Sequence, residues 1–382
     1  MDNIRYHQAL PENDRDYGSS TDRAKGFTEM NTADFVLSAD DTRALELGSV
    51  RVEFDLVVNK NGANAVGADR INIDNHVASH ALFDNVNVIL SSQGQIESID
   101  SYGRFVKMIN SATSSEDDNH KADALCELRS PNIRHTEYLI KPQLTKTSDS
   151  TATINPDCSV KLMCCLNRPS AGNFLDFSKM GSVRLQLKLA RNVAVFSGAD
   201  CGTAANTDPN YVLKNLRCVF RSVPAQNQQV QLQRVLAMNQ ALESANASIS
   251  MAVPAVVNAV SGTFLTQTRE NSYNFNNYKL ERPDNITSLQ MNYNDTTNAY
   301  QTFSLRNHQE ILHNYIDSLR SGGINDSKLS KINANDCYGI GIDFKENIDF
   351  SQGNKFSVQL DSGIDSSNPV ILFLYFHSVV NV

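Results

Sequence analysis

The sequence contains no tryptophan and few cysteines, and the cysteines are not spaced as ligands. The seven cysteines are an odd number, and no two stand in a CxxC pair. The N-terminal stretch MDNIRYHQALPENDRD lacks the apolar core of a signal peptide. We therefore expect free thiols in a protein made in a reducing cytoplasm, with no disulfide framework.

Long apolar runs and surplus positive charge are also scarce. The only long apolar run, Val370 to Val380, is too short to span a bilayer and is interpreted as a buried strand. The formal net charge of -8 argues against a protein that mainly binds nucleic-acid phosphates. Lys214, Arg217 and Arg221 are interpreted as the wet face of a strand, and no specific nucleic-acid site is expected.

The dominant pattern that is present has period two. Val52, Phe54, Leu56 and Val58 alternate with polar residues, as expected for a strand with one buried face. Similar alternation occurs in residues 86–90, 160–166, 183–189, 289–293, 356–360 and 370–376. Residues 370–376 lie within a run that is apolar on both faces and are predicted to form a central strand of their sheet. The pattern predicts antiparallel sheets with one solvated face.

Helical spacing occurs once in each half of the chain. One amphipathic helix is predicted after Ser98, with Ile99, Tyr102, Val106 and Ile109 on one face. The other is predicted after Ser304, and its apolar face comprises Leu305, His308, Leu312, Tyr315 and Leu319. The polar stretches 111–124 and 321–336 follow these helices and are predicted to form surface loops at one end of the molecule.

An Asp-Phe-Ser turn also occurs twice, at residues 176–178 and 349–351. A glycine (Gly181 or Gly353) and an alternating strand follow each turn. The order of strands, helix, loop, turn and strand is therefore repeated, which indicates two copies of one unit. The repeat predicts that strands 183–189 and 356–360 occupy equivalent positions.

The repeat predicts an all-β chain made of two consecutive jelly-roll β-sandwiches, each with roughly eight strands and one short helix. Residues 48–225 would form the first sandwich and residues 251–382 the second. Residues 226–250, rich in Gln, Asn and Ala, are interpreted as a linker that is partly helical. Residues 1–47 are mostly polar and are interpreted as an N-terminal arm that orders only against neighbouring subunits.

Four segments in this order resemble the double jelly-roll family of viral major capsid proteins. The family includes adenovirus hexon, tectivirus and corticovirus capsid proteins, virophages, and Polinton or adintovirus elements. Tyr102 stands at the Tyr position of the Polinton-type strand, turn and helix. The lack of Trp and the modest length depart from many members. The segments are DNHVASHALFDNVNVILSSQGQIESIDSYGRFVKMI, NYVLKNLRCVFRSVPA, GIDFKENIDFSQGNKFSVQLDSG and PVILFLYFHSVVNV.

The resemblance implies a structural protein and not an enzyme. It implies a homotrimer that forms a pseudo-hexagonal capsomer and tiles an icosahedral shell in the virion. Its partners would be neighbouring capsomers, penton proteins and minor capsid proteins. An internal membrane beneath the shell is an expectation from the resemblance alone, as is synthesis in the host cytoplasm.

A metal-dependent jelly-roll enzyme is the weakest alternative. His76 and His80 stand four residues apart beside Asp74, but Val77 replaces the Glu of a zinc protease and the His-x-His spacing of cupins is missing. The adjacent Cys164 and Cys165 are expected to point to opposite faces of a strand as inert thiols. No phosphate-binding GxxxxGK[ST] loop or GxSxG elbow occurs. We therefore predict no catalytic, cofactor-binding or metal-binding residues.

A receptor-binding or carbohydrate-binding sandwich is the stronger alternative, because jelly rolls also carry sugar sites. It would use a shallow aromatic site, for which Tyr273, Phe275 and Tyr278 are candidates. The carboxylates of residues 116–118 are interpreted as part of a solvated loop.

Overall fold

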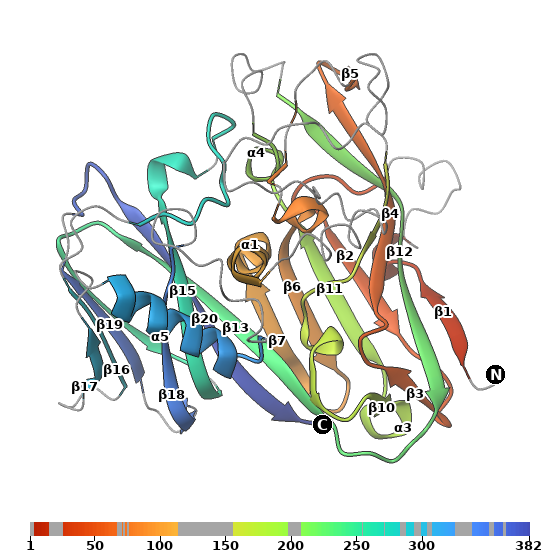
Figure 1. Cartoon of the computed structure of the whole chain (residues 1–382). Coiled ribbons are helices and arrows are strands. Elements are labelled where there is room, and N and C mark those ends of the chain that lie inside the picture. The colour runs from red at the N-terminus through yellow and green to blue at the C-terminus, as the bar shows by residue number, and fades with distance from the viewer. Residues whose placement is uncertain are drawn as a thin grey trace.

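The computed structural model shows two β-sandwiches side by side in one chain (Figure 1). Each sandwich forms where alternating apolar side chains of two sheets face one another. The described residues are 4–14, 26–66, 71, 73–74, 76–113, 156–197, 208–253, 255–270, 272–282, 288–293, 299–303, 308–324, 338–350, 355–361 and 364–382.

The first sandwich, here called barrel 1, is built from residues before 225. One sheet has the pairing order β1 (Arg5–Ala9), β12 (Asn210–Pro224), β4 (Arg51–Lys60) and β8 (Asp157–Val160). The facing sheet has the order β2 (Thr32–Leu37), β11 (Val183–Leu189), β6 (Phe83–Leu90) and β7 (Gly94–Asp100). Short strands extend the first of these sheets: β3 (Arg43–Glu46), β5 (Ala63–Asn64) and β10 (Phe174–Asp176). The short strand β9 (Pro169–Ala171) pairs instead with residues 231–232 of the second sandwich.

The second sandwich, barrel 2, has eight strands in the part of the chain that the structure describes. One sheet has the order β13 (Gln231–Leu242), β20 (Val370–Asn381), β15 (Val256–Thr266) and β18 (Ile340–Asp349). The other has the order β14 (Asn246–Ala252), β19 (Lys355–Asp361), β16 (Ser288–Tyr293) and β17 (Ala299–Phe303). As predicted, the apolar strand β20 lies between two neighbours.

The two barrels share one strand order. Strands β1, β12, β4 and β8 correspond in turn to β13, β20, β15 and β18, and β2, β11, β6 and β7 correspond to β14, β19, β16 and β17. The predicted equivalence of β11 and β19 is therefore confirmed by strand pairing. Each of the two turn aspartates, Asp176 and Asp349, ends a strand before the chain crosses to the opposite sheet. Ser351 and Gly353 lie outside the described residues.

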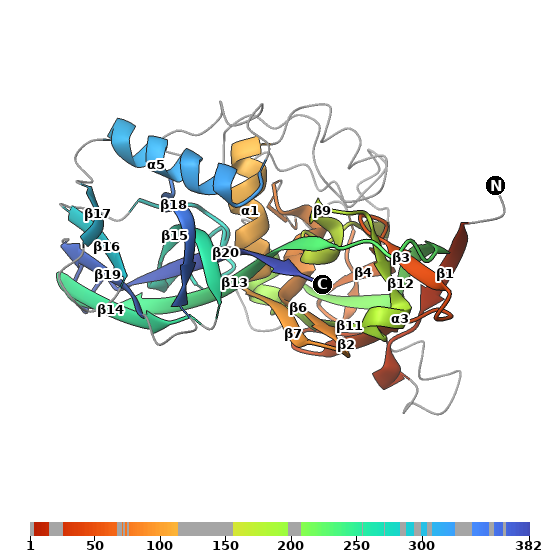
Figure 2. The same ribbon diagram turned by 90° about the horizontal axis from the view of Figure 1, so that it is seen from below.

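Each barrel has the predicted helix after the equivalent strand. Helix α1 (Tyr102–Thr113) follows β7, and α5 (His308–Ser321) follows β17. Helix α1 begins later than predicted, because Ser98 and Ile99 pair with β6 and belong to β7. Leu305 lies outside the described residues, as do 114–155 and 325–337, which include most of the two predicted loops. Figure 2 shows α1 and α5 on the same side of the molecule.

The prediction of a loosely packed N-terminal arm is wrong for residues 32–46. Strand β2 pairs with β11, and β3 pairs with β10 and β12. Phe35 and Leu37 are fully buried in the core of barrel 1. These strands are short and separated by polar turns, so their few apolar residues left no sustained periodicity in the sequence.

The prediction of a partly helical linker at 226–250 is also wrong. Strand β13 pairs with β20 along its whole length, from Gln231 opposite Asn381 to Leu242 opposite Val370. Backbone pairing with this central apolar strand outweighs the low β-propensity of Gln, Asn and Ala. The strand predicted at 160–166 ends at Val160, and residues Cys165–Asn167 form a 3₁₀ helix instead.

The first hydrophobic core extends from barrel 1 across the contact between the barrels and includes Val235, Phe373 and Tyr375 of barrel 2, whereas the second lies within barrel 2. At this contact β7 of barrel 1 runs parallel to β13 of barrel 2, with Ser98 opposite Leu236. This pairing joins one sheet of each barrel into a continuous nine-stranded sheet. We call this contact, together with the residues 272–282 that cross over it, the junction.

Candidate functional site

At the junction, buried charged residues of barrel 1 contact barrel 2. Asp74, Glu97, Arg104 and Lys107 are each at most 9% exposed, and all four belong to barrel 1. Charged groups are rarely buried to this degree unless they are paired. Their partners show that they hold barrel 2 in place.

Asp74 forms the first of these contacts. Its carboxylate accepts a hydrogen bond from the Lys107 ammonium at 2.7 Å and from the Asn276 amide of barrel 2 at 2.6 Å. Burial alone would raise the pKa of Asp74, but the nearby Lys107 and His76 and the hydrogen bonds hold it well below its usual value. Asp74 is therefore an ionised anchor for the residues 272–282.

Arg104 forms the second contact, from the first turn of α1. Its guanidinium donates to the backbone carbonyls of Asn277 and, at 3.0 Å, Lys279. The same group lies 4.5 Å from the centre of the Phe373 ring on β20. A cation of barrel 1 is thus inserted into barrel 2 and held there by backbone oxygens and an aromatic face.

Glu97 forms the third contact, on β7. It is fully buried, pairs with Arg168 at 3.1 Å, and accepts hydrogen bonds from the backbone N–H groups of Val235 on β13 and of Cys165. Burial raises the pKa of Glu97, while Arg168 and the two N–H donors oppose that rise. Glu97 therefore satisfies backbone donors on both sides of the contact.

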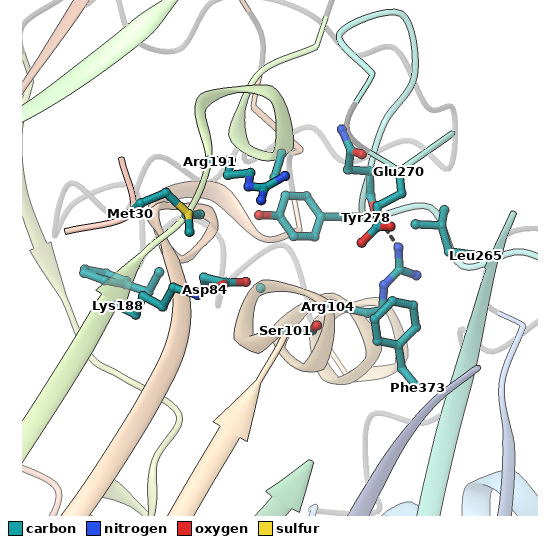
Figure 3. Close-up of a pocket in the computed structure, with 15 residues that line it drawn as sticks. Met30, Asp84, Ser101, Arg104, Lys188, Arg191, Leu265, Glu270, Tyr278 and Phe373 are labelled. Atoms are coloured by element: carbon teal, nitrogen blue, oxygen red, sulfur yellow. Dashed lines mark hydrogen bonds and ion pairs between the residues drawn. The ribbon is translucent and has the colours of Figure 1, made fainter. Parts of the chain in front are cut away.

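A cavity of about 410 Å³ lies beside these contacts (Figure 3). Arg104 and Phe373 lie on one side of it, Lys188 and Asp84 on the other, and Tyr278 between them. The Lys188 and Asp84 side chains form an ion pair at 3.4 Å. Both cations and carboxylates line the wall, so the charge of the cavity does not select an anionic or a cationic ligand.

The residues considered for a metal site do not converge on one point. His80 is buried and lies 2.8 Å from the hydroxyl of Tyr102, whereas His76 lies 3.1 Å from the Lys107 ammonium. Among the described residues, no group of three His, Cys, Asp or Glu side chains could hold a metal ion. Both histidines contact helix α1, which fits the interpretation of hydrogen-bonded structural histidines.

Two serine–histidine pairs are present that the sequence did not suggest. His7 lies 2.7 Å from the hydroxyl of Ser222, and His377 lies 2.7 Å from that of Ser261. Both serines are fully buried. A nucleophile without access to solvent cannot reach a substrate, so both pairs are structural contacts between strands.

Four cysteines lie among the described residues, and all four are buried: Cys158, Cys164, Cys165 and Cys218. Burial raises the pKa of Cys164 to about 12, which keeps its thiol protonated and unreactive. Cys164 and Cys165 lie at the start of the 3₁₀ helix and not in a strand as predicted, and both are fully buried.

Two of the three basic residues of β12, Arg217 and Arg221, form ion pairs on the outer face of their sheet. Arg217 bonds Glu53 at 2.9 Å and Arg221 bonds Glu46 at 2.6 Å. These pairs agree with the interpretation of a solvated strand face. The carboxylates of residues 116–118 lie outside the described residues, and no described helix is long and apolar enough to span a membrane.

The aromatic candidates for a sugar site do not form an exposed platform. Tyr278 is buried, and its hydroxyl donates to the carbonyl of Ala81 at 3.0 Å. Its ring lies so close to Gly103 of α1 that a Cβ there would approach within 2.5 Å. Tyr273 is partly buried against the core, and only Phe275 of these three is markedly exposed. The segment serves as packing between the barrels.

Comparison with known proteins gives a likeness of structure. No protein-family model and no curated protein sequence matches the chain. The Faustovirus major capsid protein aligns with 99% of this chain and 90% of its own, at 8% identity and a TM-score of 0.64. This chain has the double jelly-roll fold. A chain of the PBCV-1 virus capsid aligns over 99% and 94% at 10% identity with a TM-score of 0.58, and one of the Sputnik virophage over 99% and 85% at 11% identity with 0.55.

Sequence reasoning missed the junction as a site. The sequence pattern identified only the apolar face of this helix, yet every residue from Tyr102 to Ala112 is buried. The partners of Arg104 in barrel 2 lie more than 150 positions away in the sequence. One available signal was the pair of asparagines at 276 and 277, which contact buried charges through a side-chain amide and a backbone carbonyl.

Proposed function

We propose that the chain is a viral major capsid protein whose trimers form pseudo-hexagonal capsomers that tile an icosahedral shell. The observation that carries this proposal is the presence of two barrels with one strand order, joined by a buried polar junction, in a chain that matches the Faustovirus major capsid protein along 99% of its length. Three such chains would supply six similar barrels, which is what a hexagonal tile requires.

The junction supports a structural role because it fixes the angle between the barrels. Buried ion pairs and hydrogen bonds cost desolvation energy and add little net stability, but they specify one geometry. A tile whose two barrels changed their angle would not fit a regular lattice. We therefore propose that the polar contacts of Asp74, Glu97 and Arg104 serve tile geometry and that the protein is not an enzyme.

We also propose a revised domain division, with barrel 1 comprising residues 1–225 and barrel 2 residues 226–382. It replaces the arm and linker, whose strands β2, β3 and β13 belong to the sheets. Location in the virion, synthesis in the host cytoplasm, and contacts with neighbouring capsomers, penton proteins and minor capsid proteins are part of the proposal. They are supported by the family resemblance.

The proposal is tested by measuring the mass of the purified full-length chain in solution by size-exclusion chromatography with light scattering. We expect one species with three times the 42.2 kDa mass of the chain, and negative-stain images with hexagonal outlines. A monomer that binds immobilised glycans would instead support the receptor-binding or carbohydrate-binding alternative, which the buried Tyr278 does not favour.

A further inference from the structure

An amine and an amide are held on one buried carboxylate at the junction. The Lys107 ammonium on α1 and the side-chain amide of Asn276 in barrel 2 both donate to Asp74 Oδ2, at 2.7 and 2.6 Å. The two nitrogens are therefore at most two hydrogen-bond lengths apart. Asp74 and Lys107 are 9% and 8% exposed. A lysine amine held beside an asparagine amide in this way is the pair from which a side-chain amide bond can form.

Asp74 is fixed in the orientation that this pairing needs. Its other oxygen, Oδ1, accepts hydrogen bonds from the backbone N–H groups of His76 at 2.8 Å and Val77 at 3.1 Å. These two bonds use both lone pairs of Oδ1, so Oδ2 is left for the lysine and the asparagine. The carboxylate can therefore accept a proton from one nitrogen and pass it to the other without moving.

The amide of Asn276 is also oriented and polarised. Its Oδ1 accepts a hydrogen bond from the backbone N–H of Tyr278 at 2.9 Å, while its Nδ2 donates to Asp74. An N–H donor at a carbonyl oxygen stabilises the negative charge that develops there when a nucleophile attacks the carbon. Tyr278 is buried against Gly103 of α1, which holds this donor in place.

Lys107 has a proton acceptor beside it. Its ammonium lies 3.1 Å from Nδ1 of His76. An ammonium group can only donate, so Nδ1 is the acceptor and the imidazole is neutral, with its proton on Nε2. The His76 side chain is 18% exposed, so a proton that it accepts can pass to water. His76 is therefore placed to remove the proton that keeps Lys107 from acting as a nucleophile.

We propose that Lys107 and Asn276 form an intramolecular isopeptide bond that joins the two barrels covalently, with Asp74 and His76 moving the protons. Lys107 Nζ gives one proton to His76 Nδ1, and its lone pair attacks Cγ of Asn276. The negative charge on Oδ1 is held by the N–H of Tyr278, and a second proton of Nζ passes through Asp74 to Nδ2. The Cγ–Nδ2 bond then breaks, the carbonyl re-forms, and ammonia leaves and takes the proton from His76 as ammonium.

The reaction occurs once in each chain and turns over no external substrate, so it is compatible with a structural protein. It needs no second subunit, and a single event in the lifetime of the protein is enough. The bond connects distant positions of the chain, so it restricts the unfolded state and keeps residues 272–282 seated on α1. The geometry that the polar contacts of the junction specify is thereby made permanent.

The test is the intact mass of the purified, folded full-length chain, measured under denaturing conditions and followed by tryptic peptide mapping. We expect a chain lighter than its sequence by one ammonia. Because trypsin does not cleave after an acylated lysine, we also expect a branched peptide that joins residues 105–121 to residues 270–279. A wild-type chain that keeps its full sequence mass after prolonged incubation at neutral pH would overturn the proposal.

Two variants separate this bond from a cyclic imide, which Asn276 could form with the backbone nitrogen of Asn277 and which also releases ammonia. Lys107→Arg keeps a cation beside Asp74 but lacks the primary amine, so we expect the full sequence mass and an unchanged circular dichroism spectrum. Loss of ammonia in this variant would overturn the isopeptide bond. If Lys107→Arg does not fold, Asn276→Leu removes the reacting amide instead and should also keep its full mass.

The matched control is Asn274→Leu, which changes an exposed asparagine of the same segment and should lose ammonia as the wild type does. The role of His76 is tested by His76→Gln, which keeps an acceptor near Lys107 but cannot take up a proton. In freshly refolded protein sampled over time, we expect the lighter species to form more slowly in His76→Gln than in the wild type. Equal rates would overturn the assignment of His76. All of these masses are independent of the oligomeric state, so a monomeric wild type would overturn the proposed function and not the bond.

Discussion

Barrel 1 and barrel 2 have the same strand order but differ in what surrounds it. Barrel 2 consists of two four-stranded sheets, whereas barrel 1 adds the short strands β3, β5 and β10, and β9 pairs with β13 at the contact between the barrels. Most of the buried charged groups of the junction, namely Asp74, Glu97, Arg104 and Lys107, come from barrel 1, whereas barrel 2 contributes Glu281, the amide of Asn276 and backbone groups. The two barrels therefore share their strand order and differ in their short extra strands and in the charged groups that they contribute to the junction.

The cores differ in the same way. Barrel 2 has a cluster of phenylalanines, in which Phe356 meets Phe376 edge-on at 5.3 Å and also contacts Phe344 and Phe350. Barrel 1 buries polar groups among its apolar residues, such as Tyr102 hydrogen-bonded to His80 and to the N–H of Met163. Barrel 2 therefore depends on packing alone to a greater extent, and barrel 1 also depends on satisfied hydrogen bonds.

The largest effect is expected from deleting residues 1–47. The deletion removes β2, the counterpart of β14, and the buried side chains of Phe35, Leu37 and Leu45. Each large buried side chain contributes roughly 2–5 kcal/mol, so their joint loss is about as large as the total stability of a typical domain. We expect insoluble protein, or soluble protein without cooperative thermal unfolding by circular dichroism.

The control for this deletion removes residues 1–9 only. It takes away the exposed edge strand β1 and leaves β2 and β3 in place, so both cores should fold. If the variant that lacks residues 1–47 folds, barrel 1 does not need β2. The correspondence between β2 and β14 would then not be a requirement of the fold.

A smaller effect is expected from Glu97→Ala at the junction. The substitution leaves Arg168 and the N–H groups of Val235 and Cys165 buried without their acceptor. Removing one member of a buried ion pair costs about 3–5 kcal/mol. Because the lost contacts connect the barrels, we expect urea unfolding to separate into two transitions.

Glu53→Ala is the matched control for Glu97→Ala. Glu53 pairs with Arg217 on the outer face of barrel 1, where both side chains are partly exposed. Exposed pairs contribute about 0–1 kcal/mol, so a single transition close to that of the wild type is expected. If the two variants lose equal free energy of unfolding, the buried contacts of Glu97 at the junction contribute no more than an exposed ion pair.

The parts of the fold that the sequence predicted are those where one physical pattern dominated. Buried and more exposed residues alternate in β4, in β11 and, from Val86 onward, in β6, because each strand has one buried and one more solvated face. Strand β13 was missed because its pairing with β20 decides its conformation, and pairing partners are not visible in a local pattern. The strands at 32–46 were missed because their buried residues do not alternate: Ala33, Asp34 and Phe35 are buried in succession in β2, as are the residues 43–45 in β3.

The junction could not be predicted for a similar reason. A charged residue on a helix is usually solvated, and only the position of barrel 2 makes Arg104 a buried residue. His76 and His80 are four residues apart and each contacts helix α1. The contacts of Arg104 with barrel 2 instead join residues more than 150 positions apart, and no local sequence pattern shows such contacts.

The smallest effect on the free energy of unfolding is expected from the histidines of the two serine–histidine pairs at acidic pH. His377 in barrel 2 is buried, and burial lowers its pKa from 6.5 to about 3. His7 in barrel 1 is more accessible, and burial and Arg43 also lower its pKa. Between pH 6.5 and about 3 the unfolded His377 binds a proton that the folded one does not. The free energy of unfolding must therefore fall as the pH falls through this window, and His377 contributes nothing above it.

The expected loss from His377 is about 1.4 kcal/mol per pH unit below 6.5, or about 2 kcal/mol at pH 5. Urea unfolding of the wild type and of His377→Gln at pH 7.5 and pH 5 measures it, because the variant lacks the titrating group and should lose less stability on acidification. Glu97, whose pKa burial raises, opposes this trend equally in both proteins and cancels in the comparison. His7→Gln should change the pH dependence less than His377→Gln, since its imidazole is less buried. If the profiles of wild type and His377→Gln run parallel, His377 is protonated in the folded chain, and the two barrels do not differ in this respect.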